Sequence, residues 1–229
     1  MARTALLVGA TGLVGSHCLA ALLGDPEYEA VTVLARRPLA REHSRVRVHV
    51  VDFDKPEEYR RLAAGNDAFC CLGTTIKNAG SQKAFYKVDF TYPVAVAEAA
   101  LANGAEQFLI VSALGANPNA RAFYNRVKGS VEQAVAKMAF KGVHVFRPSL
   151  LVGNRAEFRL AEHIALTILS RVSFAFAGPL RRYRPIEASA VASCMVTTAK
   201  RCQTGVHVHE SEAIQTCSAG SAQLREPSR

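Results

Sequence analysis

Along the first 150 residues, short apolar runs alternate with longer segments in which apolar residues recur at helical spacing. The short runs are typical of buried strands, and the longer segments are typical of helices that pack on a sheet. Runs such as 31–34 and 108–111 are apolar on both faces, as parallel strands covered by helices are. Strands are predicted at 4–9, 30–35, 46–51, 67–72, 106–112 and 142–147, and helices at 12–23, 55–64, 83–103 and 121–140.

This alternation predicts an α/β fold, a doubly wound parallel sheet with strand order 3-2-1-4-5-6. Residues 206–209 could add a seventh strand. The alternation of strands and helices ends after the sixth strand. Helices are predicted there at 157–170 and 189–201, with an irregular loop at 172–185. We therefore expect a core over 1–151, a small lid segment over 152–216 and a flexible tail over 217–229.

Three glycines, Gly9, Gly12 and Gly15, follow the first strand at three-residue intervals. In a strand-to-helix turn, such glycines permit a tight bend, a close approach of the backbone to a pyrophosphate, and close packing of helix on strand. The N-terminus of the helix adds N–H groups and the positive end of its dipole. The pattern predicts a Rossmann-type turn that binds a dinucleotide.

Two arginines, Arg36 and Arg37, follow the second strand. An NAD site usually places an acidic residue here, about 20 positions past the glycine turn, to bind the ribose 2′-hydroxyl. This chain has no acid at that point, and guanidinium groups suit a 2′-phosphate. We therefore predict NADP as the cofactor, with NADPH preferred over NADH. The alternative is a pair of solvated arginines.

Residues that end the next two strands are further cofactor candidates. Asp52, followed by Phe53, ends the third strand, where a carboxylate could meet the adenine amino group. An Asx turn or a helix cap explains Asp52 equally well. The fourth strand ends at Leu72, Gly73 and Thr74, and Gly73 would let the backbone approach the ribose of the cofactor.

Tyr124 and Lys128 carry the clearest catalytic signal. Spacing of four on a predicted helix places them on one face, one turn apart. The charge of Lys128 can lower the pKa of a phenol, which can then pass a proton to a carbonyl oxygen as a hydride arrives. Ser112 ends the fifth strand, at the edge where such sheets bind ligands, and could orient that carbonyl. The alternative is a surface pair.

Composition narrows the class of protein. The chain has 229 residues, of which 49% are hydrophobic and 21% charged, as in soluble globular proteins. No segment is long and apolar enough to span a membrane, and the first apolar run reads as a strand rather than a signal peptide. The six cysteines show no CxxC spacing, and the histidines show no metal-site pattern, so no metal is expected. These features indicate a cytoplasmic protein.

A net charge of +9 raises the question of nucleic acid, but no nucleic-acid motif or aromatic platform accompanies it. We therefore expect no nucleic-acid partner. The predicted helices at 83–103 and 121–140 could form a homodimer surface. The expected ligand besides the cofactor is a small molecule, and Phe158, Phe174, Phe176 and Tyr183 suggest a partly apolar pocket for it.

Together, the glycine turn, Ser112, the Tyr124/Lys128 pair and the segment 146–151 resemble the short-chain dehydrogenase/reductase superfamily. The glycine spacing resembles its extended and atypical branches. Segments 71–75, 88–89 and 127–132 are similar to those of the Tat-interacting-protein-like oxidoreductases. The chain departs from the pattern in two ways: the segment after Leu151 is short, and no asparagine lies in the middle of 83–103, where many members complete a proton relay.

The resemblance implies roles for individual residues. Tyr124 would be the general acid/base, Lys128 its activator and a ribose ligand, and Ser112 the group that orients the carbonyl. The residues implied to hold the cofactor are those of the pyrophosphate turn, of the 2′-phosphate position and of the backbone beside the nicotinamide: Gly9, Thr11, Gly12, Leu13, Val14, Gly15, Arg36, Arg147, Pro148 and Leu150.

Two functions follow. The first is an NADPH-dependent reductase of a small carbonyl compound, because all three catalytic residue types are present. The second is a non-catalytic NADP(H)-binding regulator whose nucleotide state controls a protein partner, which the short substrate segment would allow.

Overall fold

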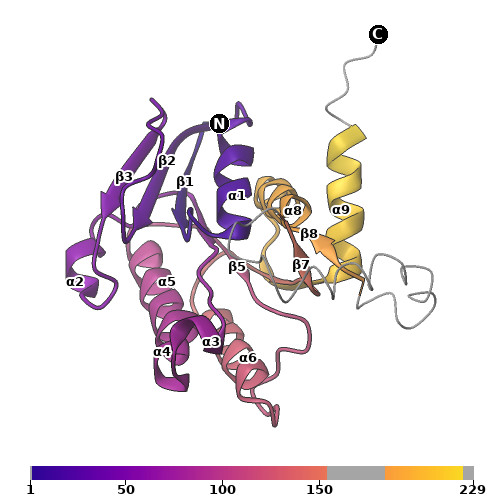
Figure 1. The fold of residues 1–229 in the computed structure, drawn as a ribbon. Coiled ribbons are helices and arrows are strands. Elements are labelled where there is room, and N and C mark those ends of the chain that lie inside the picture. Colours follow the sequence, from indigo (N-terminus) through magenta and orange to yellow (C-terminus); the bar gives the residue numbers. More distant parts are fainter. Residues whose placement is uncertain (1, 154–183, 224–229) are drawn as a thin grey trace.

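A seven-stranded parallel sheet organises the fold (Figure 1). The computed structural model describes residues 2–153 and 184–223. The strand order is β3-β2-β1-β4-β5-β6-β9, which confirms the predicted order and the seventh strand. The strands are β1 (Arg3–Val8), β2 (Tyr28–Ala35), β3 (Val46–Val50), β4 (Asp67–Cys70), β5 (Gln107–Val111), β6 (Gly142–Arg147) and β9 (Gly205–Glu210).

Helices cover both faces of this sheet (Figure 1). One face packs against α1 (Leu13–Leu23), α8 (Ala188–Lys200) and α9 (Ser211–Gln223). The other packs against α5 (Tyr92–Ala102) and α6 (Phe123–Ala136). Shorter elements are α2 (Pro56–Tyr59), α3 (Ile76–Ala79), α4 (Gln82–Tyr86) and the strand pair β7 (Leu151–Val152) and β8 (Ile186–Glu187).

Alternate residues of the central strands supply the two hydrophobic layers. Neighbouring Cys70 and Cys71 show this directly, because Cys70 packs under α5 and α6 while Cys71 packs on the α1 side. In β5, Leu109 and Phe108 divide between the same two layers. Burial on both faces is what the doubly apolar strands predict.

The segment predicted as one helix over 83–103 contains a break. A π-helical turn, η1 (Lys87–Thr91), joins α4 to α5. Pro93 has no N–H to donate to the carbonyl of Asp89, four residues earlier, so the regular α-helical pattern is interrupted there. The break matters for function, because Asp89 is buried within it.

At the C-terminal end, α9 continues to Gln223, where the sequence predicts a flexible tail from Cys217. Ile214 is fully buried, and Cys217 packs against the core that contains Cys194 of α8. The first half of α9 is therefore packed on the core. The predicted helix at 157–170, most of the loop at 172–185, and the aromatic residues Phe158, Phe174, Phe176 and Tyr183 lie outside the described residues.

A stack of histidines on β6 and β9 makes the fold sensitive to acid. His144 is fully buried, its ring lies 5.1 Å from that of His207, and its Nε2 lies 3.0 Å from Oε1 of Gln107. Burial, followed by the charges of His209 and His207, lowers the pKa of His144 from 6.5 to about 4. Between these values the unfolded chain binds the proton and the folded chain does not, so stability falls as the pH falls.

We therefore expect the free energy of unfolding to drop by about 3 kcal/mol between pH 7 and pH 4 through His144 alone. Urea unfolding of the wild type and of His144→Gln, measured at both pH values, checks this. Glutamine can keep a hydrogen bond to Gln107 but does not titrate, so the variant should lose less stability in acid. Equal losses in the two proteins would show that His144 does not cause the acid sensitivity.

Candidate functional site

The turn between β1 and α1 has the geometry of a phosphate cradle. Gly9 has a φ of +81°, and a Cβ there would lie 2.5 Å from the carbonyl oxygen of Cys71. The N–H of Gly12 donates to the Gly9 carbonyl at 2.8 Å, which closes the turn. A Cβ at Gly15 would collide with that same carbonyl oxygen. Two of the three glycines are therefore required by the packing of the turn itself.

The first backbone N–H groups of α1 have no side-chain cap. Gly12 is its N-cap residue and provides no side chain to cap the first N–H groups, and the first turn carries no acidic residue. Thr11 is exposed, Leu13 is half-buried and Val14 is buried. Backbone N–H groups at a helix N-terminus bind phosphate oxygens, so this turn fits a pyrophosphate.

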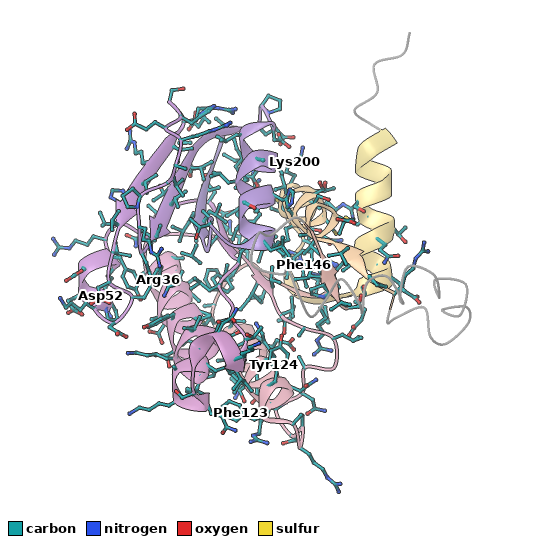
Figure 2. All side chains as sticks on the ribbon, in the orientation of Figure 1. Arg36, Asp52, Phe123, Tyr124, Phe146 and Lys200 are labelled. Carbon is teal, nitrogen blue, oxygen red and sulfur yellow. The ribbon has the colours of Figure 1, made fainter. Side chains whose placement is uncertain are left out.

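Figure 2 shows Arg36 and Asp52 on the side of the sheet where the strands end, with Lys200 on the opposite side. Arg36 and Arg37 are exposed, and within the described residues neither guanidinium makes a hydrogen bond or ion pair. Both are therefore available to an anionic ligand next to the end of β2.

The end of β3 contains the Asx turn that is one of the two explanations for Asp52; the contact with adenine stays a prediction. The Oδ1 of Asp52 accepts the N–H of Asp54 at 2.9 Å, which is the Asx turn, although its side chain remains exposed. The ring of Phe53 is buried, with its centroid 5.5 Å from those of both Tyr59 and Tyr92. Phe53 therefore belongs to the core, and a contact of its ring with a cofactor does not follow from this geometry.

The end of β4 passes over a buried ion pair. Leu72 packs on the core, and the N–H of Thr74 donates to Oδ2 of Asp89 at 2.9 Å. A Cβ at Gly73 would make only ordinary contacts, 3.5 Å from Oδ1 of Asp89 and 3.6 Å from Nζ of Lys128. Packing within the chain therefore does not require glycine at 73, and this residue is exposed.

Tyr124 and Lys128 lie together in the first half of α6, as the spacing predicts. The Tyr124 side chain is half-buried, and its ring packs against that of Phe85 at a centroid distance of 5.4 Å. Lys128 is buried, and its Nζ lies 2.8 Å from Oδ1 of Asp89. Burial alone would lower the pKa of Lys128, but the charge of Asp89 and the nearby Tyr124 outweigh it and raise that pKa above 10.5. Lys128 therefore carries its positive charge next to a phenol.

Ser112 is buried one residue past β5, and its hydroxyl donates to Oε1 of Glu132. Arg147 holds the same carboxylate through Nε and Nη2, at 3.1 and 2.6 Å, and reaches Glu210 at 3.0 Å. A serine hydroxyl has one proton, so in this arrangement Ser112 has none to donate to a carbonyl. The role expected for Ser112 does not follow from this geometry.

Two further residues follow β6, Pro148 and Leu150, and they differ in exposure. Pro148 is buried and its carbonyl accepts the N–H of Leu114 at 3.0 Å, whereas the side chain of Leu150 is 45% exposed. The Arg147 side chain is committed to carboxylates, so only its backbone could meet a nicotinamide.

Sequence reasoning missed Asp89 and Glu132, the two carboxylates that engage the predicted catalytic residues. In the segment 83–103 the family pattern predicts an asparagine, whereas an acidic residue between Val88 and Phe90 is itself a signal. Such a residue in an apolar stretch is buried only when it is paired. Glu132 follows Lys128 by one helical turn, which places it on the same face of α6.

A family model described as NAD(P)H-binding matches residues 9–144, more than half of the chain. The rat protein HTATIP2 is 38% identical over 167 residues, which cover 71% of this chain and 69% of that protein. The protein "FMP52, mitochondrial" of Eremothecium gossypii is 38% identical over 152 residues, which cover 66% of this chain and 67% of that protein.

Solved structures share the fold. MoeE5 in complex with UDP-glucuronic acid and NAD has a TM-score of 0.67 at 16% identity, over 97% of this chain and 82% of that one. The oxidoreductase ylbE of Lactococcus lactis has a TM-score of 0.64 at 17% identity, over 99% of this chain and 100% of that one. No helix within the described residues is long and apolar enough to cross a membrane. The chain belongs to the NAD(P)H-binding family, within the short-chain dehydrogenase/reductase superfamily.

Proposed function

We propose that the protein is an NADP(H)-dependent oxidoreductase that reduces a small carbonyl compound, with Tyr124 as the proton donor. One observation carries this proposal: a charged, buried Lys128 lies beside the Tyr124 phenol on the helix that follows β5. Ligands of doubly wound sheets bind at the carboxyl ends of the strands, where this phenol and the glycine turn both lie.

The residues present fit a dinucleotide. The glycine turn and the N-terminus of α1 would hold the pyrophosphate, Arg36 and Arg37 a 2′-phosphate, and the exposed backbone at Gly73 a ribose. When bound, a reduced nicotinamide supplies a hydride to the carbonyl carbon. One solved structure with this fold, MoeE5, is a complex with NAD. That observation belongs to MoeE5, and it supports the proposal that this fold holds a dinucleotide here.

The chain's own contribution is control of one proton. Tyr124 would donate its hydroxyl proton to the carbonyl oxygen as that oxygen gains negative charge, and would recover a proton from solvent. The ammonium of Lys128 favours the phenolate left behind. The contact of Tyr124 with Phe85 fixes the ring, so the hydroxyl keeps one position.

The cofactor preference has a direct test. We expect Arg36→Ala to bind NADPH about 10- to 100-fold more weakly and NADH unchanged, because charge-assisted hydrogen bonds to a phosphate are each worth about 1.5–3 kcal/mol. Binding is measured by calorimetric titration of both nucleotides. The matched control is Arg47→Ala, which removes an exposed arginine from within β3. Tighter binding of NADH than of NADPH by the wild type would reject the preference.

The reaction is tested by NADPH oxidation with a set of aldehydes and ketones. The wild type should oxidise NADPH with at least one of them, and Tyr124→Phe should do so about 10²- to 10⁴-fold more slowly.

One observation favours a second candidate, a non-catalytic NADP(H)-binding regulator. The proton of Ser112 is committed to Glu132, so the group expected to orient a substrate carbonyl is not free to do so. This candidate predicts tight NADPH binding, no oxidation across the same carbonyl set, and a protein partner whose affinity depends on the nucleotide.

A further inference from the structure

Asp89 is a buried carboxylate that the proposed reaction does not use. It lies in the π-helical turn η1, is 1% exposed, and is held from two directions. Its Oδ2 accepts the N–H of Thr74 at 2.9 Å, and its Oδ1 lies 2.8 Å from Nζ of Lys128. A carboxylate is costly to bury, so one held in this way at a functional site calls for an explanation.

We propose that Asp89 is a positioning residue, whose carboxylate keeps the buried ammonium of Lys128 charged and fixed beside Tyr124. The inference deepens the proposed function and rests on it for its catalytic meaning. It makes a separate claim about the electrostatics of the chain, which holds or fails without any substrate.

The argument starts from the burial of Lys128. Its side chain is only 6% exposed, and burial of that kind favours the neutral amine. Asp89, Tyr124 and Cys70 face it from η1, α6 and β4. Phenols and thiols are ordinarily neutral at pH 7, and burial raises the pKa of Cys70 to about 12. Of these groups, Asp89 is therefore the one that supplies negative charge to balance the ammonium.

Position follows from the same contacts. The Thr74 N–H fixes one oxygen of Asp89, so the other is directed at Lys128 beneath Gly73. An ammonium has three N–H donors. The ion pair with Asp89 therefore leaves N–H donors of Lys128 for other acceptors. Without the carboxylate, Lys128 would lose both its counter-charge and its fixed direction.

The test is Asp89→Asn. Asparagine has nearly the same shape, and its carbonyl can still accept the Thr74 N–H, so the substitution keeps that contact while it removes the negative charge and the oxygen that faces Lys128. Lysine Cε–Nζ groups are observed in a ¹³C–¹⁵N correlation spectrum as the pH is raised, and the Lys128 signal is assigned from its absence in Lys128→Met. We expect the pKa of Lys128 to be above 10.5 in the wild type and at least one unit lower in Asp89→Asn.

Asp54→Asn is the matched control. Asp54 forms an exposed ion pair with Lys87 at 2.7 Å, so the same chemical change there should lower the pKa of Lys87 and leave that of Lys128 unchanged. An unchanged Lys128 pKa in folded Asp89→Asn would overturn the proposal. Should Asp89→Asn fail to fold, the wild type decides, because a Lys128 that loses its proton below pH 9 would contradict it.

The outcomes separate the two proposals. If the wild type fails to oxidise NADPH with any of the carbonyl compounds while the pKa of Lys128 falls in Asp89→Asn, the proposed reaction is overturned and the role of Asp89 is supported. An active wild type with no change of the Lys128 pKa in Asp89→Asn does the reverse. Since loss of packing would not selectively deprotonate one lysine, the titration distinguishes a positioning role from a structural one.

Discussion

Tyr124→Phe should bind NADPH as the wild type does and reduce carbonyl substrates about 10²- to 10⁴-fold more slowly, the range that proton transfer by a placed side chain contributes. Phenylalanine keeps the ring that packs against Phe85 at 5.4 Å and removes only the hydroxyl. The proton that neutralises the developing alkoxide then has to come from water, without help from Lys128. Steady-state NADPH oxidation and a parallel binding titration measure the two effects.

Tyr86→Phe is the matched control for this prediction. Tyr86 is 41% exposed and stacks on Phe90 with a centroid distance of 4.7 Å, so the same hydroxyl is removed away from Lys128. Its turnover should equal that of the wild type. Equal turnover in Tyr124→Phe would instead remove Tyr124 from the mechanism.

Gly9→Ala should abolish detectable cofactor binding. The φ of +81° disfavours any residue with a Cβ, and that Cβ would lie 2.5 Å from the carbonyl oxygen of Cys71, so the turn has to move. Movement of the turn displaces the first N–H groups of α1, which are the expected ligands of the pyrophosphate. We expect NADPH affinity to fall more than 100-fold, as about 3 kcal/mol of lost contacts implies, and calorimetric titration measures it.

Gly80→Ala separates backbone strain from loss of the cradle. Gly80 has nearly the same φ, +80°, but a Cβ there would meet nothing within 4 Å. This variant should lose about 1 kcal/mol of stability and bind NADPH normally. If Gly9→Ala also bound NADPH normally, the glycine turn would not be the pyrophosphate site.

The sheet was predictable because short stretches of the sequence are enough to identify its strands and the helices between them. The central strands β1, β4, β5 and β6 are short runs that are apolar on both faces, and most crossovers contain a helical pattern, which together favour a doubly wound sheet. The Tyr124/Lys128 pair was predictable for the same reason, since a spacing of four on a helix fixes one face.

The carboxylates of the site could not be located in this way. Asp89 reaches Lys128 because a π-helical turn interrupts a segment whose composition predicts a continuous helix. Ser112 meets Glu132 only because β5 and α6 pack together. The position of Ser112 at the end of a strand predicts instead a hydroxyl that faces a substrate. Asp52 shows a third case, because an Asx turn and a ligand contact call for the same residue at the same place.

The central claim is that hydride transfer occurs at this site with Tyr124 as proton donor. The most direct measurement is transfer of deuterium from NADPH deuterated at C4, prepared with the label on either face, to the alcohol formed from a carbonyl substrate, followed by mass spectrometry. We predict a product one mass unit heavier with the wild type, for one of the two labels, and about 10²- to 10⁴-fold slower formation of that product with Tyr124→Phe. Bound NADPH that transfers no deuterium to any carbonyl would contradict the account.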